Sequence, residues 1–190
     1  MLCHIILKKG MILRASGDDL ESFFYTLRHL DEWVARNAVG HPVDEGDFME
    51  WGGVPGLQYV IAFKVICMGD SNAVDLAQQT HLCALQSLGC MKEEETLEYR
   101  KAIPQGSTME GLYIDDHLCF QLTSARRRLS STSPHRPQVQ KTKLRDEEIM
   151  ETSRCMYERV GWNRSMPQTF DKIQDFIRLG VLQSAVPLAR

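Results

Sequence analysis

The stretch that decides the expected fold is Gly111-Leu112-Tyr113-Ile114-Asp115-Asp116-His117-Leu118-Cys119-Phe120. Apolar and aromatic residues flank the two adjacent aspartates, Asp115 and Asp116, on both sides. This symmetry predicts a β-hairpin over residues 111–122 that carries the aspartates at its tip. The neighbouring His117 is expected to alternate outward from that hairpin, with a general base beside Asp116 as the alternative.

A second pair of acids, Asp18 and Asp19, follows an apolar stretch that predicts a strand over residues 11–15. Adjacent carboxylates repel one another, so gathering two such pairs in one cleft costs stability unless a divalent cation neutralises them. Magnesium prefers one or two carboxylates together with water and phosphate oxygens. Each pair alone also has an ordinary explanation, because Asp115-Asp116 suits a solvated turn and Asp18-Asp19 suits a helix N-cap.

The rest of the chain predicts a mixture of helices and strands. Apolar residues recur at three- and four-residue steps in several segments, which is the helical spacing. The expected helices are 20–39, 72–88, 146–160 and 169–179. Residues 57–68 are rich in β-branched and aromatic side chains and predict a strand, whereas the glycine-rich and acidic residues 41–56 predict a loop.

Three segments together resemble a known family. Tyr113-Ile114-Asp115-Asp116 resembles the Y-x-D-D motif of reverse transcriptases. Asp19-Leu20-Glu21-Ser22-Phe23-Phe24 resembles that family's upstream motif, an aspartate followed five residues later by an aromatic ring. Met68-Gly69-Asp70-Ser71 resembles its glycine turn before a helix. The resemblance covers roughly residues 11–170 and implies an α+β fold, a polymerase palm-like antiparallel sheet backed by helices, with fingers and thumb largely missing.

The resemblance also implies a chemistry, which is RNA-directed DNA synthesis by two-metal nucleotidyl transfer. A primer hydroxyl would attack a deoxynucleoside triphosphate on an RNA or DNA template. The implied catalytic and metal-binding residues, ligands of two Mg²⁺ or Mn²⁺ ions, are Asp19, Asp115 and Asp116. Phe24 would be a steric gate against a ribose 2′-hydroxyl, with a plain core aromatic as the alternative. Gly69 would let the backbone approach the nucleotide, and Tyr113 would brace the primer end.

Several departures from the family pattern favour a second interpretation of the chain's function. The family often has glutamine where this chain has Met68, and it places a lysine near Gly161, where this chain offers Arg164, Gln168 and Lys172. Residues 1–10 are too few to form the basic fingers, and a thumb has no room after residue 180. The alternative is therefore a noncatalytic palm remnant that binds nucleic acid or a partner protein. Fingers and thumb segments could also come from a longer retroelement polyprotein.

Charge divides the chain more sharply than its net charge of −3 indicates. Residues 121–145 contain basic side chains and no acidic one. We expect a palm core over 1–122, a basic Ser/Pro/Arg linker over 123–140 and a C-terminal helical part over 141–190. The linker contains three consecutive arginines, Arg126, Arg127 and Arg128. They could hold template phosphates, form a nuclear-import patch or remain solvated.

Composition excludes several classes of protein. Hydrophobic residues at 43% and charged residues at 25% are typical of a globular domain. No apolar run is long enough to cross a membrane. The six cysteines form no C-x-x-C pair, so a zinc site is not expected. We expect an intracellular location, in the cytoplasm or the nucleus. Metalloprotease, G-x-S-x-G hydrolase and Walker motifs are absent from the sequence.

Overall fold

The computed structural model describes residues 5, 7–125, 143–165 and 168–170. The chain forms two compact units, one made of residues 1–21 with 78–190 and the other of residues 22–77. The first unit holds a four-stranded sheet with helices, and the second holds a two-stranded sheet. The α+β class with antiparallel sheets is therefore confirmed. The expected linker over 123–140 lies almost wholly outside the described residues.

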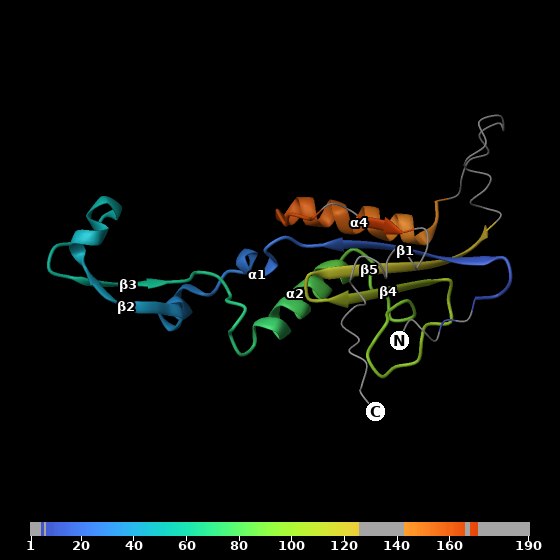
Figure 1. Ribbon diagram of the computed structural model, residues 1–190, viewed down its shortest axis with the longest axis horizontal. Coiled ribbons are helices and arrows are strands. Elements are labelled where there is room, and N and C mark those ends of the chain that lie inside the picture. The colour runs from blue at the N-terminus through green and yellow to red at the C-terminus, as the bar shows by residue number, and fades with distance from the viewer. Residues whose placement is uncertain (1–4, 6, 126–142, 166–167, 171–190) are drawn as a thin grey trace, which may run out of the picture. The chain divides into compact units, whose positions relative to one another are not determined.

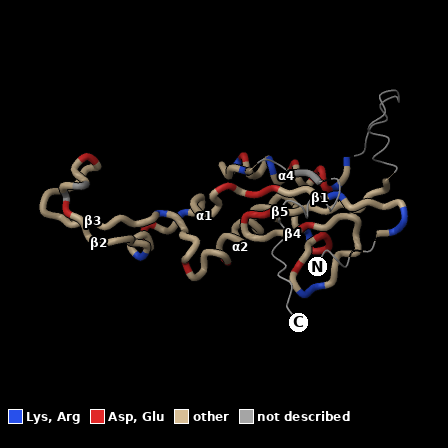
Figure 2. The backbone as a smooth tube through the Cα atoms, viewed as in Figure 1, with Lys and Arg blue, Asp and Glu red and all other residues tan. Residues whose placement is uncertain are grey.

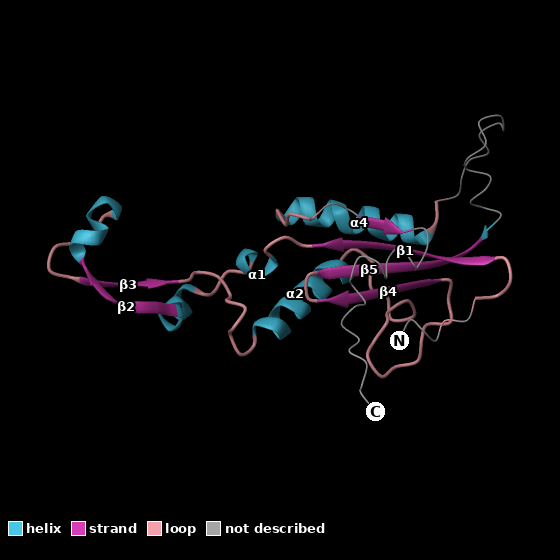
Figure 3. Ribbon diagram, viewed as in Figure 1, coloured by secondary structure: helices cyan, strands magenta, loops and turns pink. Residues whose placement is uncertain are grey.

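The sheet of the first unit is antiparallel throughout (Figures 1 and 3). Its spatial order is β4-β5-β1-β6. The strands are β1 (Met11–Asp19), β4 (Thr108–Tyr113), β5 (Asp116–Ser124) and β6 (Gln168–Phe170). The predicted hairpin is confirmed as β4 and β5, joined by a two-residue turn. The predicted strand over 11–15 is also confirmed, and it continues through both aspartates because all of it pairs with β5.

Two helices of the first unit were predicted correctly. They are α2 (Ala73–Gln86), which begins in the second unit, and α4 (Arg145–Val160). Each is followed by a glycine at positive φ, Gly89 and Gly161, which suits a helix stop because glycine has no Cβ to clash there. Helix α4 contacts β1 and β5 (Figure 1).

The two faces of this sheet differ in character because successive side chains of a strand alternate between them. One face carries an apolar cluster of Leu13, Ala15, Met109 and Phe120. The other face, which meets the helices, includes buried polar side chains such as Asp18 and His117. There the ring of His117 on β5 lies 6.5 Å from the ring of His81 on α2, centroid to centroid.

The outward orientation expected for His117 is wrong. Its side chain is fully buried, and its Nε2 lies 3.1 Å from Oε2 of Glu110 on β4. The reason is the position of β5, which has a strand on each side and helices over the face that carries His117. A residue next to a turn is thus buried here, because its strand lies between two other strands of the sheet.

The second unit is built around a β-hairpin, β2 (Ala38–Asp44) with β3 (Gln58–Ala62) (Figure 1). Helix α1 spans only Phe23–Thr26, and short 3₁₀ helices span Asp31–Asn37 and Glu45–Trp51. Many large apolar side chains of this unit are exposed, among them Leu30, Trp51, Leu57 and Ile61. A two-stranded sheet alone buries little apolar surface.

The predicted helix over 20–39 is wrong, although its apolar spacing is helical. Amphipathic helices are stabilised mainly by packing their apolar face, and Leu30 remains 63% exposed. The backbone instead pairs in extended form, since Ile66 N donates to Leu27 O and His29 N donates to Lys64 O.

Three other boundaries also needed correction. The expected loop over 41–56 contains part of β2 and a 3₁₀ helix, and the expected strand over 57–68 ends at Ala62. The helix expected over 169–179 does not begin where predicted, because residues 168–170 form β6 and pair with β1. Its remaining residues lie outside the described ones. Among the helices that the structure describes, none is both long enough and apolar enough to span a bilayer.

Candidate active site

The sheet register brings the two acidic pairs of the sequence together. Asp19, the last residue of β1, lies directly across from Asp116, the first residue of β5. The backbone N–H of Leu20 donates to the carbonyl of Asp115 at 3.2 Å. Figure 2 shows acidic residues where β1 ends and where β5 begins. Asp19, Asp115 and Asp116 therefore share one end of the sheet.

The side chains of Asp19 and Asp116 lie at a position of close approach. The Leu20–Asp115 hydrogen bond makes the neighbouring Asp19–Asp116 pair a non-hydrogen-bonded one, in which side chains are closest. The Cβ atoms of such a pair are about 4.5–5.5 Å apart. Tyr113 pairs with Asp116 from the other side and is 69% exposed. The three side chains thus form a row, on the face opposite to Asp18 and His117.

Burial and neighbouring negative charges raise the pKa of two carboxyl groups at this end of the sheet, Asp115 and Asp116. The pKa of Asp116 is raised to about 6, first by burial and then by the negative charges of Asp115 and Asp19. Burial also raises the pKa of Asp115, partly offset by a bond from its own backbone, and the charge of Asp19 raises it further. At both groups the neighbouring negative charges add to the effect of burial, and a bound cation would relieve this part of the shift.

The oxygen donors at this end of the sheet are of the kind that a hard divalent cation prefers. Carboxylate oxygens are the ligands that Mg²⁺ prefers, and one or two of them suffice when water and phosphate complete the shell. One oxygen of Asp19 is engaged, since the Ser165 hydroxyl donates to its Oδ2 at 3.2 Å. Within the described part of the chain, no three His, Cys, Asp or Glu side chains are grouped so that all could hold one metal ion.

The turn that carries Asp115 is strained. Ile114 has a φ of 55°, a conformation that a β-branched residue rarely adopts. Two side chains of α2 hold it. The Gln78 amide accepts a hydrogen bond from Ile114 N at 2.6 Å and donates to Leu112 O at 3.3 Å. His81 Nδ1 lies 2.8 Å from Ile114 O. The acidic end of the hairpin is therefore fastened to a helix.

The other predicted site residues are not all brought to this row. Phe24 in α1 and Gly69 in a turn belong to the second unit, so their predicted roles stay predictions. Phe24 is half-buried and its neighbour Phe23 is fully buried. A Cβ on Gly69 would meet nothing within 4 Å, so local crowding does not require glycine there. The predicted nucleic-acid-binding residues Arg126, Arg127 and Arg128 lie outside the described residues.

Asp18, the neighbour of Asp19 in sequence, has a different environment on the opposite face. Its buried carboxylate forms ion pairs with Arg164 Nη1 at 3.1 Å and Arg154 Nε at 3.5 Å. Arg164 is one of the residues considered in place of the expected lysine near Gly161. Its guanidinium neutralises Asp18 and does not belong to the Tyr113–Asp116–Asp19 row.

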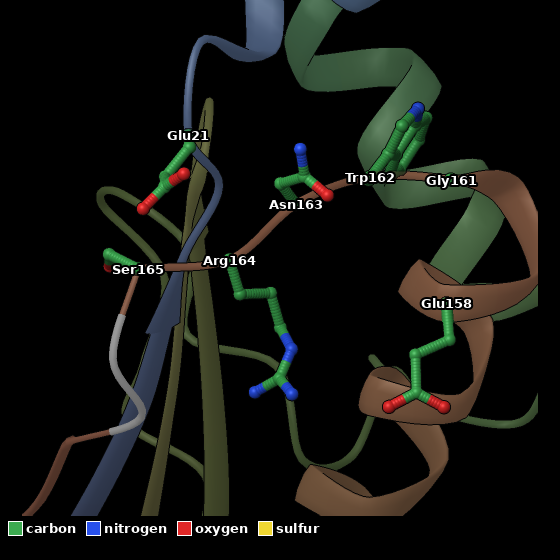
Figure 4. Close-up of a pocket in the computed structure, with 7 residues that line it drawn as sticks. All are labelled: Glu21, Glu158, Gly161, Trp162, Asn163, Arg164 and Ser165. Carbon is green, nitrogen blue, oxygen red and sulfur yellow. The ribbon is translucent and has the colours of Figure 1, made fainter.

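A pocket of about 510 Å³ lies between the end of β1 and the C-terminal end of α4 (Figure 4). Its lining residues are Glu21, Glu158, Gly161, Trp162, Asn163, Arg164 and Ser165. In Figure 4 the Arg164 side chain extends between the strand and the helix that carries Glu158. Because Arg164 is already paired with Asp18, the pocket offers mixed charge and no strong preference for an anion. It adjoins the acidic row through Ser165, whose N–H donates to Asp19 O.

Sequence reasoning missed Gln78, His81 and Ser165. A signal existed for His81, because Ala73, Ala77, His81 and Leu85 follow one another at four-residue steps and all are buried. A polar residue within such a stripe indicates a specific hydrogen-bond partner. No comparable local pattern marks Ser165, whose role depends on how the segment after α4 returns to β1.

No protein-family model matches the chain, and none of the curated proteins matches its sequence. The functional argument therefore depends on the motifs and on the geometry of the site.

Proposed function

We propose that this protein is a template-directed nucleotidyl transferase, an RNA-directed DNA polymerase of the reverse transcriptase type with a palm-like sheet. The observation that carries the proposal is the register of β1 and β5, which sets Asp19 opposite Asp116 and beside Asp115. The raised pKa values of Asp115 and Asp116, to which burial and then the charge of Asp19 contribute, support it. So does the exposed position of Tyr113 beside Asp116.

Two Mg²⁺ or Mn²⁺ ions would be held by three carboxylates at this end of the sheet, which we call the acidic row: Asp19, Asp115 and Asp116. When bound, such ions activate an attacking hydroxyl and stabilise a departing pyrophosphate. The protein's own contribution is to keep carboxylates close together at the end of a rigid sheet. With a pKa of about 6, Asp116 is mostly ionised at neutral pH and available to a cation. Tyr113 would brace the primer end from its exposed place in the row.

The partners under this proposal are an RNA or DNA template-primer and deoxynucleoside triphosphates. Arg126, Arg127 and Arg128 would add phosphate contacts whose strength falls with salt. Fingers and thumb segments of a longer retroelement polyprotein would supply the remaining grip on substrate. The many exposed apolar side chains of the second unit are consistent with such further segments.

Primer extension tests the proposal directly. Purified protein with Mg²⁺, a primed RNA template and deoxynucleoside triphosphates is expected to extend the primer. Asp115→Asn should reduce the rate at least about 100-fold, because a catalytic ion is worth several kcal/mol and each 1.4 kcal/mol is about tenfold. Glu94→Gln, at an exposed acid away from the row, is the matched control and should extend normally.

The outcomes separate the enzyme from its rival. Extension that is unaffected by Asp115→Asn contradicts the catalytic assignment. Binding of the primed template without extension, together with no binding of Mn²⁺, indicates the noncatalytic remnant that binds nucleic acid. Extension that appears only when fingers and thumb segments are added supports the polymerase as part of a longer protein.

A further inference from the structure

The turn between β4 and β5 adopts a conformation that its own sequence disfavours. Ile114 lies at positive φ in the two-residue turn that separates Tyr113 from Asp116. For an L-residue with a branched Cβ this conformation is disfavoured, because its Cβ comes too close to the following carbonyl oxygen. Such strain persists only where the surrounding structure over-determines it, and it concentrates at functional sites. Something outside the hairpin must therefore hold the turn.

Gln78 is the first of the groups that hold it. Its side-chain oxygen accepts from Ile114 N at 2.6 Å, and its side-chain nitrogen donates to Leu112 O at 3.3 Å. One amide thus engages the backbone on both sides of Tyr113. An apolar side chain of the same length could fill the space and would make neither bond.

His81, one helical turn further along α2, holds the far side of Ile114. The carbonyl of Ile114 can only accept, so Nδ1 of His81 carries the hydrogen of the 2.8 Å bond. The other nitrogen, Nε2, then accepts from the hydroxyl of Tyr157 on α4 at 2.9 Å. Burial lowers the pKa of His81 to about 4, so the ring is neutral at pH 7. The carbonyl of Ile114 thus selects the tautomer, and the Tyr157 hydroxyl satisfies the remaining ring nitrogen.

We propose that Gln78 and His81 are positioning residues that hold the Ile114 turn in its strained conformation and so keep Asp115 and Asp116 close to Asp19. Three backbone groups of the turn, Leu112 O, Ile114 N and Ile114 O, are bound to one helix. Neither residue touches the carboxylates, so their effect on the row passes through the backbone. That this positioning serves catalysis rests on the proposed function. That Gln78 and His81 hold the Ile114 turn does not depend on it.

Proton NMR of the folded protein without metal or nucleic acid tests the inference through the contact between Asp19 and Asp116. The Hα atoms of a non-hydrogen-bonded antiparallel pair lie close together, so the wild type should give a strong nuclear Overhauser effect between the Hα atoms of Asp19 and Asp116. Gln78→Met fills the same space and removes the bonds to Leu112 O and Ile114 N. We expect this signal to fall at least about twofold, because a relaxed turn separates the two strand ends. Gln79→Met, at the exposed neighbouring position, is the control and should leave the signal unchanged.

A second variant connects the effect to strain. In an Ile114→Gly background the turn reaches positive φ without a steric penalty, so Gln78→Met should weaken the Asp19–Asp116 signal at most half as much. Should Gln78→Met fail to fold, Gln78→Glu serves instead, since it keeps an acceptor for Ile114 N and loses only the donor to Leu112 O. A signal of the same strength in the wild type and in the folded Gln78 variant overturns the inference.

His81→Leu tests the His81 half. The variant keeps an apolar side chain in the buried space and removes the donor to Ile114 O, so the Asp19–Asp116 signal should weaken here too. An unchanged signal would remove His81 from the proposal. The measurement needs no turnover, so a protein that shows no primer extension but passes it loses the proposed function and keeps the positioning role.

Discussion

The two faces of the β4-β5-β1 sheet place acidic residues in different electrostatic surroundings. On the face that meets α2 and α4, each buried acid has a partner of complementary charge or hydrogen-bonding capacity. Asp18 is paired with Arg154 and Arg164, and Glu110 accepts from Met91 N at 2.8 Å and lies against His117. On the opposite face, Asp116 at the sheet end is partly buried and lies near the negative charges of Asp115 and Asp19.

This difference indicates which acids serve the fold. A buried charge that is neutralised within the protein stabilises only as long as its partner remains. Acids that repel one another raise the free energy of the folded state and are stabilised by a ligand. Asp18 and Asp19, adjacent in sequence, fall on opposite sides of this division because a strand turns successive side chains to opposite faces.

The largest expected effect comes from breaking the buried pair on the helix face. Glu110→Ala leaves the buried His117 Nε2 and Met91 N without an acceptor, and each unsatisfied group costs about 1–3 kcal/mol. Urea denaturation should show a loss of about 3 kcal/mol. Glu94→Ala, at an exposed acid, should change stability little. Equal losses for the two variants would contradict the structural role of Glu110.

Asp18→Ala is expected to cost somewhat less, about 2–3 kcal/mol. It leaves Arg154 and Arg164 without their carboxylate, but both guanidinium groups are partly exposed, so water compensates in part. Asp19→Ala, one residue along and on the other face, should be neutral or slightly stabilising. Thermal denaturation of the two variants measures the contrast directly. A greater loss for Asp19→Ala would invert the assignment of the two faces.

A divalent cation should stabilise the acidic row. At ten times its dissociation constant, a ligand that binds only the folded protein adds about 1.4 kcal/mol, or about 3–6 °C in Tm for a chain of this size. We expect this rise with Mn²⁺ in the wild type and not in Asp115→Asn. Glu94→Gln should respond as the wild type does. A shift of equal size in Asp115→Asn would show that the cation binds elsewhere.

The smallest effect concerns pH. The folded-state pKa of Asp116 is about 6, above its ordinary 3.8, so the folded protein binds that proton more tightly than the unfolded chain does. The free energy of unfolding therefore falls as pH rises from about 4 to about 6. Asp116→Asn removes this loss and should be more stable than the wild type at pH 7, by about 1 kcal/mol because water screens a half-exposed group.

Urea denaturation at both ends of that window measures the effect. The advantage of Asp116→Asn should disappear below pH 4, where the wild-type carboxyl group is protonated in both states. Asp75→Asn, at an exposed position of α2, provides the control. An advantage of the same size at pH 4 and pH 7 would not come from titration of Asp116.

Local patterns predicted the elements whose stabilising contacts repeat along one segment. The β4–β5 hairpin was predictable because apolar residues flank Asp115 and Asp116 within one short stretch. Helices α2 and α4 were predictable because their apolar spacing leads into Gly89 and Gly161, each at positive φ. The same reasoning gave a wrong helix over residues 20–39. The apolar residues there have helical spacing, but Leu30 is not packed against any surface that would bury it.

The sequence by itself determined the two acidic pairs, the hairpin and the two long helices, because each depends on side chains close together in the chain. Only the tertiary structure decided that Asp19 faces Asp116 while Asp18 faces arginines, and that His117 is buried. Those outcomes depend on strand register and on the order β4-β5-β1-β6. Register is set by packing between distant segments, and a shift of one residue would exchange the roles of Asp18 and Asp19.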